Sequence, residues 1–546
     1  MQLAEVRRWA RGRRIPVPEF RRAYDGALLH AITRLLQAIY RESRVTRLSQ
    51  DNRGQWHLDV GRKFILRAPV SGPLPFRRLE TIGSPWLRNT RTRRRVRTTG
   101  AFLNALSRCL AGTEYDSVLP ALRADFENSV ANVVLNRLIG GSLGPKARAI
   151  EPAYQGHQYY PFPALRIGPD LSQVLECSHL CREPVRLPLL RIGSCRLISC
   201  VFDSYEACLR SWSGLETPSR SAALMPLHPW QVQLSPLVRE LSARKLVTVS
   251  RRTLEAIPLA SQRTCRIVRT GFDLKLSIDA TLTGERRLLH QLNCENAPIV
   301  SVLAKQFLDE KGKAQLDFQE DLASICHAEP AIAPHLSAIV RAPVRTLPGE
   351  MVIPAINLWS GNQEFRTLLR SGDRAHAEEF FQHYCRALMK GPVEFWSQWG
   401  MGFEPHLQNV YVAIRNGFPS RIILRDLDAS ILDPRRIRPT LRKLGLDLPK
   451  ETWAVMPAFE TGGKRLVQAM LFGHLGEVMW CLTQGGHSET GRLASIVEDT
   501  WSELAAHAPS ASARRSVNRL RSWSNAVKAT LRTRLHRTTT LEFVRE

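Results

Sequence analysis

The change of sequence texture along the chain constrains its fold more than any other feature. Residues 23–42 and 115–140 place apolar residues at helical spacing, and the last third is also mainly helical. Between them, after Gly140-Gly141, short apolar strands separated by Pro and Gly run to about residue 300. Helices and strands that occupy separate blocks predict an α+β fold. At 546 residues, the chain is expected to form several domain-sized units.

We expect the three units to be an N-terminal domain of helices and strands (1–140), a strand-rich middle domain (141–350) and a helical C-terminal domain (351–546). In the C-terminal domain, Asn416-Gly417 lies between two alternating apolar runs and predicts a hairpin over 409–427. Helices are expected there at 374–396, 463–482, 489–507 and Arg514–Arg534, the last one basic and amphipathic.

The charge balance favours anionic partners. Lys and Arg number 77 against 50 Asp and Glu, a net charge of +27. This suits nucleic acid, a membrane surface, nucleotides or polycarboxylates, and equally a basic solvated surface. The strongest charge run, Arg88–Arg97, has no interleaved aromatic residues and is interpreted as a solvated loop. No apolar run is long enough to span a membrane and no secretory signal is apparent, so we expect a cytoplasmic protein.

Standard nucleotide and metal motifs are not found. Thr461-Gly-Gly-Lys464-Arg465 lacks the upstream Gly and the Ser/Thr of a phosphate-binding loop. The eleven Cys residues form no disulfide framework, which fits a reducing compartment. Cys177, His179 and Cys181 lack a second pair at zinc-finger spacing, so buried free thiols are expected there.

A segment with alternating polar residues, Lys275–Thr283, indicates an anion site. Lys275, Ser277, Asp279, Thr281 and Thr283 would share one face of an extended strand, as they would on a plain solvated sheet. The neighbouring Ser261-Gln-Arg263-Thr264 and the following Arg287 add two cations and more hydroxyls. Three cations and several hydroxyls in one region are what a triphosphate or a polycarboxylate requires.

A second polar grouping precedes and follows the predicted hairpin. Glu404, His406 and Gln408 alternate, Asn409 follows, and Asp426 returns at the far end of the hairpin. A carboxylate pair beside a His and amides could hold Mg²⁺ and phosphate oxygens, although capping and turn chemistry would use the same residue types.

Two further motifs interrupt the strand-rich region. Gly156-His157-Gln-Tyr-Tyr160-Pro161 runs on to Arg166-Ile-Gly168. In His228-Pro229-Trp230-Gln231 we expect a structural role, with Pro229 fixing a turn and Trp230 filling a core.

The order GHxxxP, RxG, HPWQ, SxRT, KLS, ExHxQN and RD over residues 156–426 resembles the IucA/IucC family of siderophore synthetases. The resemblance implies a cupped-hand architecture with thumb, fingers and palm, and often a homodimer. It implies an enzyme that uses ATP and Mg²⁺ to adenylate a polycarboxylate such as citrate, a citryl intermediate or 2-oxoglutarate. An amine or alcohol then displaces AMP to give an amide or ester. The C-terminal third is similar to the region that this family shares with ferric iron reductases, without their cysteine cluster.

The resemblance also assigns roles to residues. Carboxylate binding is expected from His157, Thr283 and Arg287, catalysis from Lys275, Arg287 and His406, and metal binding from Glu404 and Asp426. The residues expected to bind ATP are Ser261, Arg263, Thr264, Lys275, Arg287, His406, Gln408, Asn409 and Asp426.

The chain departs from the family pattern in its first motif and at Asp279 and Thr281, which stand where Asn and His are common. Where GHPxHPxxKxR is usual, Gln158, Tyr160 and Ala164 replace the first Pro after the His, the second His and the Lys. Losing a His and a Lys removes up to two positive charges, which indicates a different acid or nucleophile. Two alternatives follow: a family member that binds nucleotide or siderophore without catalysis, and a basic nucleic-acid-binding protein, which the absence of any nucleic-acid motif makes unlikely.

Overall fold

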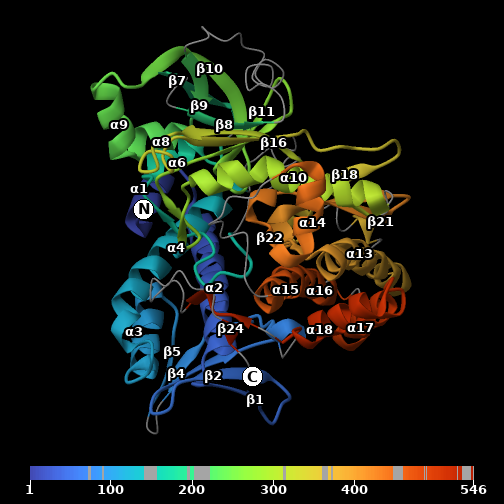
Figure 1. Ribbon diagram of the computed structural model, residues 1–546. Coiled ribbons are helices and arrows are strands. Elements are labelled where there is room, and N and C mark those ends of the chain that lie inside the picture. Colours follow the sequence, from blue (N-terminus) through green and yellow to red (C-terminus); the bar gives the residue numbers. More distant parts are fainter. Residues whose placement is uncertain are drawn as a thin grey trace.

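The computed structural model describes the chain except for residues 72–74, 89–91, 141–155, 182, 194–196, 202–221, 312–314, 360–366, 370–372, 447–458, 485, 487, 526, 532–542 and 545–546. It combines helices with several separate sheets, so the predicted α+β class is confirmed (Figure 1). The predicted boundaries at 140 and 350 stay a prediction.

The N-terminal region packs helices against an antiparallel meander. The predicted helix at 23–42 is the C-terminal part of a longer helix. The apolar face of that helix shares a core with helix α4 (Leu119–Gly140) and the sheet. The helices are α1 (Leu3–Gly12), α2 (Val17–Glu42), α3 (Thr99–Leu110) and α4 (Leu119–Gly140). The strands are β1 (Thr46–Gln50), β2 (Trp56–Val60), β3 (Ile65–Pro69), β4 (Trp86–Arg88) and β5 (Arg93–Arg95). The run Arg88–Arg97, predicted as a solvated loop, lies partly in paired strands: Arg88 ends β4 and Arg93–Arg95 form β5. The Arg93–Arg95 side chains are exposed as expected, whereas Val96 is buried.

The middle of the chain builds an eight-stranded sheet in the order β8-β16-β17-β12-β11-β10-β7-β9, antiparallel throughout. Its strands are β7 (Val185–Gly193), β8 (Leu197–Val201), β9 (Ala222–Pro226), β10 (Thr248–Pro258), β11 (Thr264–Ile267), β12 (Asp273–Leu276), β16 (Asp321–His327) and β17 (Ser337–Arg341). A separate small sheet borders the pocket described below. Its strands are β6 (Arg166–Ile167), β13 (Thr281–Leu282) and β14 (Glu285–Arg286). The short helices here are α6 (Leu171–Cys177), α8 (Pro229–Leu234) and α9 (Pro236–Ala243).

The continuous strand expected over Lys275–Thr283 is wrong. Strand β12 ends at Leu276, and pairing resumes only at Thr281 in a different sheet. Between them, the backbone of Asp279 is bound by the Gln231 side chain at 2.6 Å, and the Ser277 hydroxyl donates to the Pro334 carbonyl at 2.7 Å. These side-chain bonds replace ladder bonds and turn the chain toward a second wall of the site.

Helix α10 (Gln291–Lys311) joins the large sheet to the C-terminal region. Cys294 and Ala297 pack with residues of β16 and β17, whereas Val300, Leu303 and Phe307 belong to the C-terminal core. Figure 1 shows the helix running between the sheet and the C-terminal helices.

The C-terminal region surrounds a four-stranded sheet in the order β15-β21-β20-β18. Its strands are β15 (Leu316–Phe318), β18 (Met351–Pro354), β20 (Val410–Arg415) and β21 (Phe418–Leu424). The predicted hairpin is confirmed: Asn416 and Gly417 both have positive φ, as a two-residue turn between twisted strands requires. A two-stranded pair, β19 (Met401–Gly402) and β22 (Ile431–Leu432), flanks it.

The helices of this region are α11 (Ala355–Trp359), α13 (Arg374–Glu394), α14 (Pro434–Leu444), α15 (Phe459–Val467), α16 (Gly476–Gln484), α17 (Thr490–Ala506) and α18 (Ala511–Ser522). A π-helical stretch, Gln468–Leu475, connects α15 to α16. The helix expected to run to Arg534 ends at Ser522, and the chain continues as β23 (Val527–Lys528), paired with β24 (Phe543–Val544).

One helical stretch, Phe459–Gln484, is long and apolar enough to cross a membrane by length and composition. However, 83% of its apolar window is buried inside the protein, which is the pattern of a core helix.

A buried ion network ties the N-terminal helices to this core helix. The Glu477 carboxylate accepts from Arg34 Nη1 at 2.8 Å and from Arg78 Nη2 at 3.1 Å, and all three side chains are almost fully buried. Arg34 also donates to the backbone carbonyl of Gln158 at 2.6 Å. The two guanidiniums lower the pKa of Glu477 to about 2 although burial opposes its ionisation.

We predict that Glu477→Gln destabilises the protein by about 3 kcal/mol, because it removes the negative charge that pairs with two buried guanidiniums, of which Arg78 would keep only Glu80. Thermal denaturation measures the loss. Glu498→Gln is the matched control: its partner Arg521 is solvent-exposed, and we expect a change below about 0.5 kcal/mol. Equal stability of the two variants would contradict the importance of the buried network.

Candidate active site

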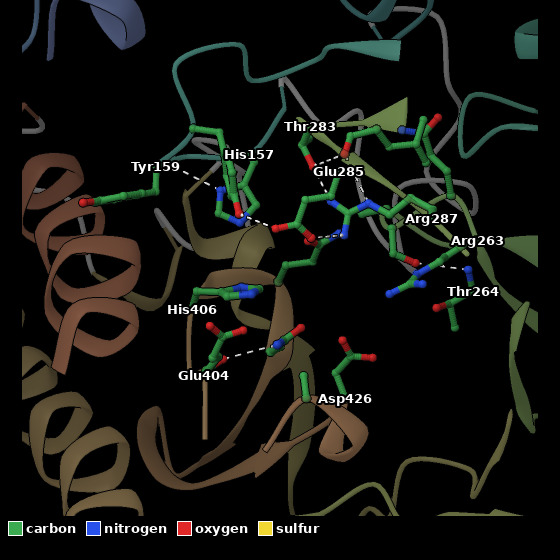
Figure 2. Close-up of a pocket in the computed structure, with 18 of the residues that line it drawn as sticks. His157, Tyr159, Arg263, Thr264, Thr283, Glu285, Arg287, Glu404, His406 and Asp426 are labelled. Atoms are coloured by element: carbon green, nitrogen blue, oxygen red, sulfur yellow. Dashed lines mark hydrogen bonds and ion pairs between the residues drawn. The ribbon is translucent and has the colours of Figure 1, made fainter. Parts of the chain in front are cut away.

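One pocket of about 420 Å³ gathers all twelve residues expected to act in the site. It lies among the edge of β11 and β12, the small β13–β14 sheet, the hairpin β20–β21 and the π-helical stretch (Figure 2). The expected motifs come from positions up to 269 residues apart in the chain, from His157 to Asp426. Their convergence supports one shared site, while the role of each residue stays a prediction.

The first wall is the turn between β10 and β11. Gln262 N–H donates to the Leu259 carbonyl at 2.8 Å, and the Ser261 hydroxyl accepts from the Thr264 amide at 3.1 Å. Arg263 follows this turn, and among the described residues its guanidinium makes no hydrogen bond or ion pair. Burial lowers the Arg263 pKa to about 10, so the group remains charged at neutral pH. It is a half-buried cation available to an anionic ligand.

Lys275 reaches the pocket from the strand opposite Thr264, its register partner. Its ammonium already contacts Asp426 Oδ1 at 2.8 Å and Asp428 Oδ1 at 2.6 Å, and the side chain is 2% exposed. In this structure Lys275 therefore neutralises protein carboxylates, whereas Arg263 is the open cation of this wall.

Asp426 lies two residues after the end of β21, and its backbone is strained. Its φ of 71° is uncommon for a residue with a side chain. Oδ1 accepts from Lys275 and Arg341, whereas among the described residues Oδ2 has no hydrogen-bond partner. Burial opposes ionisation, but Lys275, Arg341 and Arg263 lower the pKa of Asp426 well below its usual value. The free oxygen of a fixed anion is a suitable metal ligand.

The second wall holds Thr283 and Arg287. Thr283 is β-branched and has a φ of 54°, and its amide donates to the Leu165 carbonyl at 2.9 Å. Arg287 Nε donates to the Leu282 carbonyl at 3.1 Å, and Nη2 donates to the Thr283 hydroxyl. These bonds place the guanidinium and the hydroxyl side by side in the pocket, as Figure 2 shows.

His157 is held by a glycine turn. Gly156 has a φ of +115°, and a Cβ there would lie 2.3 Å from the Pro163 carbonyl oxygen, which accepts from the His157 amide at 2.8 Å. The Tyr159 amide donates to His157 Nδ1 at 3.2 Å, which leaves the ring proton on Nε2. Burial, His406 and Arg287 lower the pKa of His157 well below its usual value, so the ring is neutral.

His406 lies beside His157, with ring centroids 5.1 Å apart. Its Cβ packs on Gly473, where a side chain would approach to 3.1 Å. Burial lowers the pKa of His406 to about 4, although Glu404 and Asp426 oppose the shift. Two neutral imidazoles can accept a proton or donate a hydrogen bond near neutral pH.

The remaining predicted residues line the loop before β20. Glu404 binds Arg465 through Oε1, and Asn409 Nδ2 donates to the Glu404 carbonyl at 3.3 Å. The Gln408 carbonyl accepts from Arg425 at 2.7 Å. Burial raises the Glu404 pKa, but Arg465 and Lys528 outweigh it and lower the value to about 2.

The sequence reasoning missed several charged residues of the pocket, namely Glu285, Arg341, Asp428, Arg465 and Lys528. Asp428 follows Asp426 by only two positions, so the Arg425-Asp426 motif could have been extended to include it. Arg341 is two positions from Ile339, the register partner of Lys275. Its place beside the pocket follows from the pairing of β12 with β17, which the sequence does not show. Lys528 lies in the segment predicted as a basic amphipathic helix, and no motif in the sequence marks it as a pocket residue.

The His228-Pro229-Trp230-Gln231 motif has the expected structural role. His228 Nδ1 caps helix α8 by accepting from the Trp230 amide at 3.1 Å, and Pro229 occupies the first helical position. Trp230 is fully buried and donates to the Gln173 carbonyl at 2.9 Å. The motif supports the fold and does not line the pocket.

The two carboxylates assigned to a magnesium ion, Glu404 and Asp426, both line the pocket. Glu404 Oε2 and Asp426 Oδ2 both lack a hydrogen-bond partner among the described residues. The described part of the chain holds no group of three or more His, Cys, Asp or Glu that could bind a metal. A Mg²⁺ ion there would therefore need further oxygen ligands from a phosphate or water, which is its usual preference.

Comparisons with known proteins give two family matches. Residues 146–359 match the model described as the IucA / IucC family, and residues 378–542 match that of the ferric iron reductase FhuF-like transporter. In the FhuF-like part, Cys385 and Cys481 are free cysteines.

The chain is similar to curated proteins along most of its length. It is 23% identical over 538 residues to the uncharacterized protein y4xN of Sinorhizobium fredii, covering 83% of this chain and 84% of that protein. It is 22% identical over 486 residues to D-ornithine–citrate ligase of Staphylococcus aureus, covering 74% of this chain and 73% of that protein.

The fold is shared with a solved enzyme. The structure of ATP-bound aerobactin synthetase IucA from Klebsiella pneumoniae superimposes with a TM-score of 0.74 at 16% identity, over 87% of this chain and 92% of that chain. This likeness concerns the arrangement of the backbone.

We predict that His406 stays neutral from pH 8 to pH 5.5, because burial disfavours the imidazolium. NMR of protein with ¹³C-labelled histidine should show one ring signal that does not move in this range and that His406→Gln removes. The exposed His507, which does not line the pocket, provides a surface comparison in the same spectra. A midpoint near 6.5 for the His406 signal would contradict the prediction.

Proposed function

We propose that this chain is an ATP-dependent siderophore synthetase. The proposal builds on the match of residues 146–359 to the IucA / IucC family, whose resemblance implies siderophore synthesis. Its reaction would join a polycarboxylate to an amine or alcohol. The observation that carries the proposal is the convergence of Arg263, Arg287 and Asp426 in one pocket with the two neutral histidines.

The charge of the pocket suits two anionic substrates. Among the described residues, nine lysines and arginines line it against four carboxylates. A carboxylate that approaches a triphosphate brings two anions together, and fixed cations offset this repulsion without reorganisation. Arg263 and Arg287, which come from two different walls, would each face one of them.

In the proposed first step, a carboxylate oxygen of the acid attacks the α-phosphorus of ATP. The bond to the bridging oxygen breaks, and pyrophosphate leaves with its electron pair. Arg287, Thr283 and His157 would orient the attacking carboxylate, and Arg263 with the Ser261–Thr264 turn would hold the phosphates. Glu404 and Asp426 would hold Mg²⁺, which supplies positive charge to phosphate oxygens.

In the proposed second step, the amine or hydroxyl attacks the acyl carbon of the adenylate and AMP leaves. The nucleophile must lose a proton, and a neutral imidazole can accept one. His406, with its lowered pKa, is the candidate base, and the adjacent His157 holds the same charge state.

The departures from the family motif change one wall of the pocket. Tyr160 donates to the Glu285 carboxylate at 3.4 Å, and Ala164 lines the pocket without a charge. We propose that this wall accepts an acid or nucleophile other than the usual pair. A cytoplasmic location, catalysis as a homodimer and the cupped-hand division into thumb, fingers and palm belong to the same proposal.

We predict that ATP, Mg²⁺, hydroxylamine and a panel of polycarboxylates give pyrophosphate and a hydroxamate with at least one acid. Pyrophosphate release and the coloured iron complex of the hydroxamate are measured in parallel. ATP binding without pyrophosphate release from any acid would favour a family member without catalysis. Binding to DNA or RNA with a steep salt dependence, and no ATP binding, would favour the nucleic-acid alternative.

We also predict that Arg287→Ala lowers the rate of pyrophosphate release by at least about 100-fold, because transition-state charge loses a fixed donor. Circular dichroism checks that the variant is folded. The matched control is Arg244→Ala, which removes an exposed surface arginine paired with Glu240. A rate within two-fold of the wild type for Arg287→Ala would remove this residue from the site.

A further inference from the structure

Arg341 is a buried arginine that no motif of the sequence pointed to. It closes strand β17, and its side chain is 2% exposed. Nε donates to Asp321 Oδ1 at 2.6 Å, and Nη2 contacts Asp428 Oδ1 at 3.2 Å and Asp426 Oδ1. One guanidinium therefore links three carboxylates from two separate parts of the fold.

The geometry points to Arg341 as a positioning residue: together with Asp321 it fixes Asp426 and leaves free the Oδ2 oxygen, which would bind the Mg²⁺ that accompanies ATP. This inference rests on the proposed function, and it adds residues that act through Asp426 rather than on the substrate.

Asp426 needs such support because its backbone is strained. A non-glycine residue in the left-handed region carries a conformational cost and persists only where its surroundings hold it. Its side chain is 23% exposed, whereas that of the neighbouring Asp428 is 2% exposed. Asp428 is thus an internal countercharge, and Asp426 is the carboxylate that reaches the ligand space.

The two oxygens of Asp426 have different environments. Both printed contacts, with Lys275 and with Arg341, are made by Oδ1, and Oδ2 is unpartnered among the described residues. Two donors on one oxygen define the rotation of the carboxylate, and the second oxygen remains available. Lys275 alone could not do this, because its ammonium is shared with both oxygens of Asp428.

Asp321 fixes Arg341 in turn. The two residues are register partners on β16 and β17, and the Asp321 amide donates to the Ser301 hydroxyl of helix α10 at 2.8 Å. The planar guanidinium bridges Asp321 and Asp426 through two different nitrogens. A lysine has a single nitrogen and cannot reproduce that fork.

The test compares ATP binding at increasing Mg²⁺ concentrations by calorimetry, without an acid substrate. We expect Arg341→Lys to raise the Mg²⁺ concentration needed for half-maximal ATP binding by about 10-fold or more. Asp321→Asn should raise it by about 3-fold, because Arg341 keeps its contacts with the other two carboxylates.

The matched control is Arg421→Lys. Arg421 is also buried and bridges two carboxylates, with Asp317 at 2.8 Å and Glu350 at 2.9 Å, but it does not line the pocket. Both lysine variants should lose thermal stability, whereas only Arg341→Lys should change the Mg²⁺ requirement. A purely structural role of Arg341 would give the two variants the same Mg²⁺ dependence.

A folded Arg341→Lys protein with the wild-type Mg²⁺ dependence would overturn the inference. If that variant does not fold, Asp321→Asn decides, and an unchanged Mg²⁺ requirement overturns the inference equally. Absence of ATP binding to the wild-type protein would instead overturn the proposed function and, with it, the role of Arg341.

Discussion

The pairing of Lys275 and Arg341 with Asp426 and Asp428 is the interaction on which the pocket depends. It joins the eight-stranded sheet to the end of the C-terminal hairpin. The side chains of Lys275, Arg341 and Asp428 are almost fully buried there, so water cannot replace their charged partners. Buried charges of this kind add little net stability but are costly to separate. Their contribution is to fix one arrangement of two distant parts of the chain.

Backbone strain gathers at the same place. Eight described non-glycine residues have positive φ, and three of them, Gln262, Thr283 and Asp426, line the pocket. Each belongs to a different wall: the turn after β10, the small sheet and the end of the hairpin. Strained conformations persist where surrounding contacts over-determine them, and such places are often functional. The strain is therefore an independent indication of the site.

Much of the site could be predicted, because its residues interrupt apolar segments in short motifs. Glu404 and His406 stand out before a strand pair, and Arg263 follows a turn. The hairpin itself was predictable from Asn416-Gly417, whose conformation is local. The interrupted strand after Leu276 was not, because the bonds from Gln231 and to Pro334 come from distant segments. Lys528 and Arg341 were not predicted for the same reason, since only tertiary packing brings them to the pocket.

The Arg34 contact has a consequence for how the protein can be divided. The same guanidinium holds the backbone carbonyl of Gln158, next to His157, and the carboxylate of Glu477 in the core helix. A truncated protein that began after residue 140 would leave Glu477 without this cation and one pocket loop without its tether. The first helices are therefore part of the machinery around the pocket, and the domain with the sequence motifs cannot be treated as a module that works by itself.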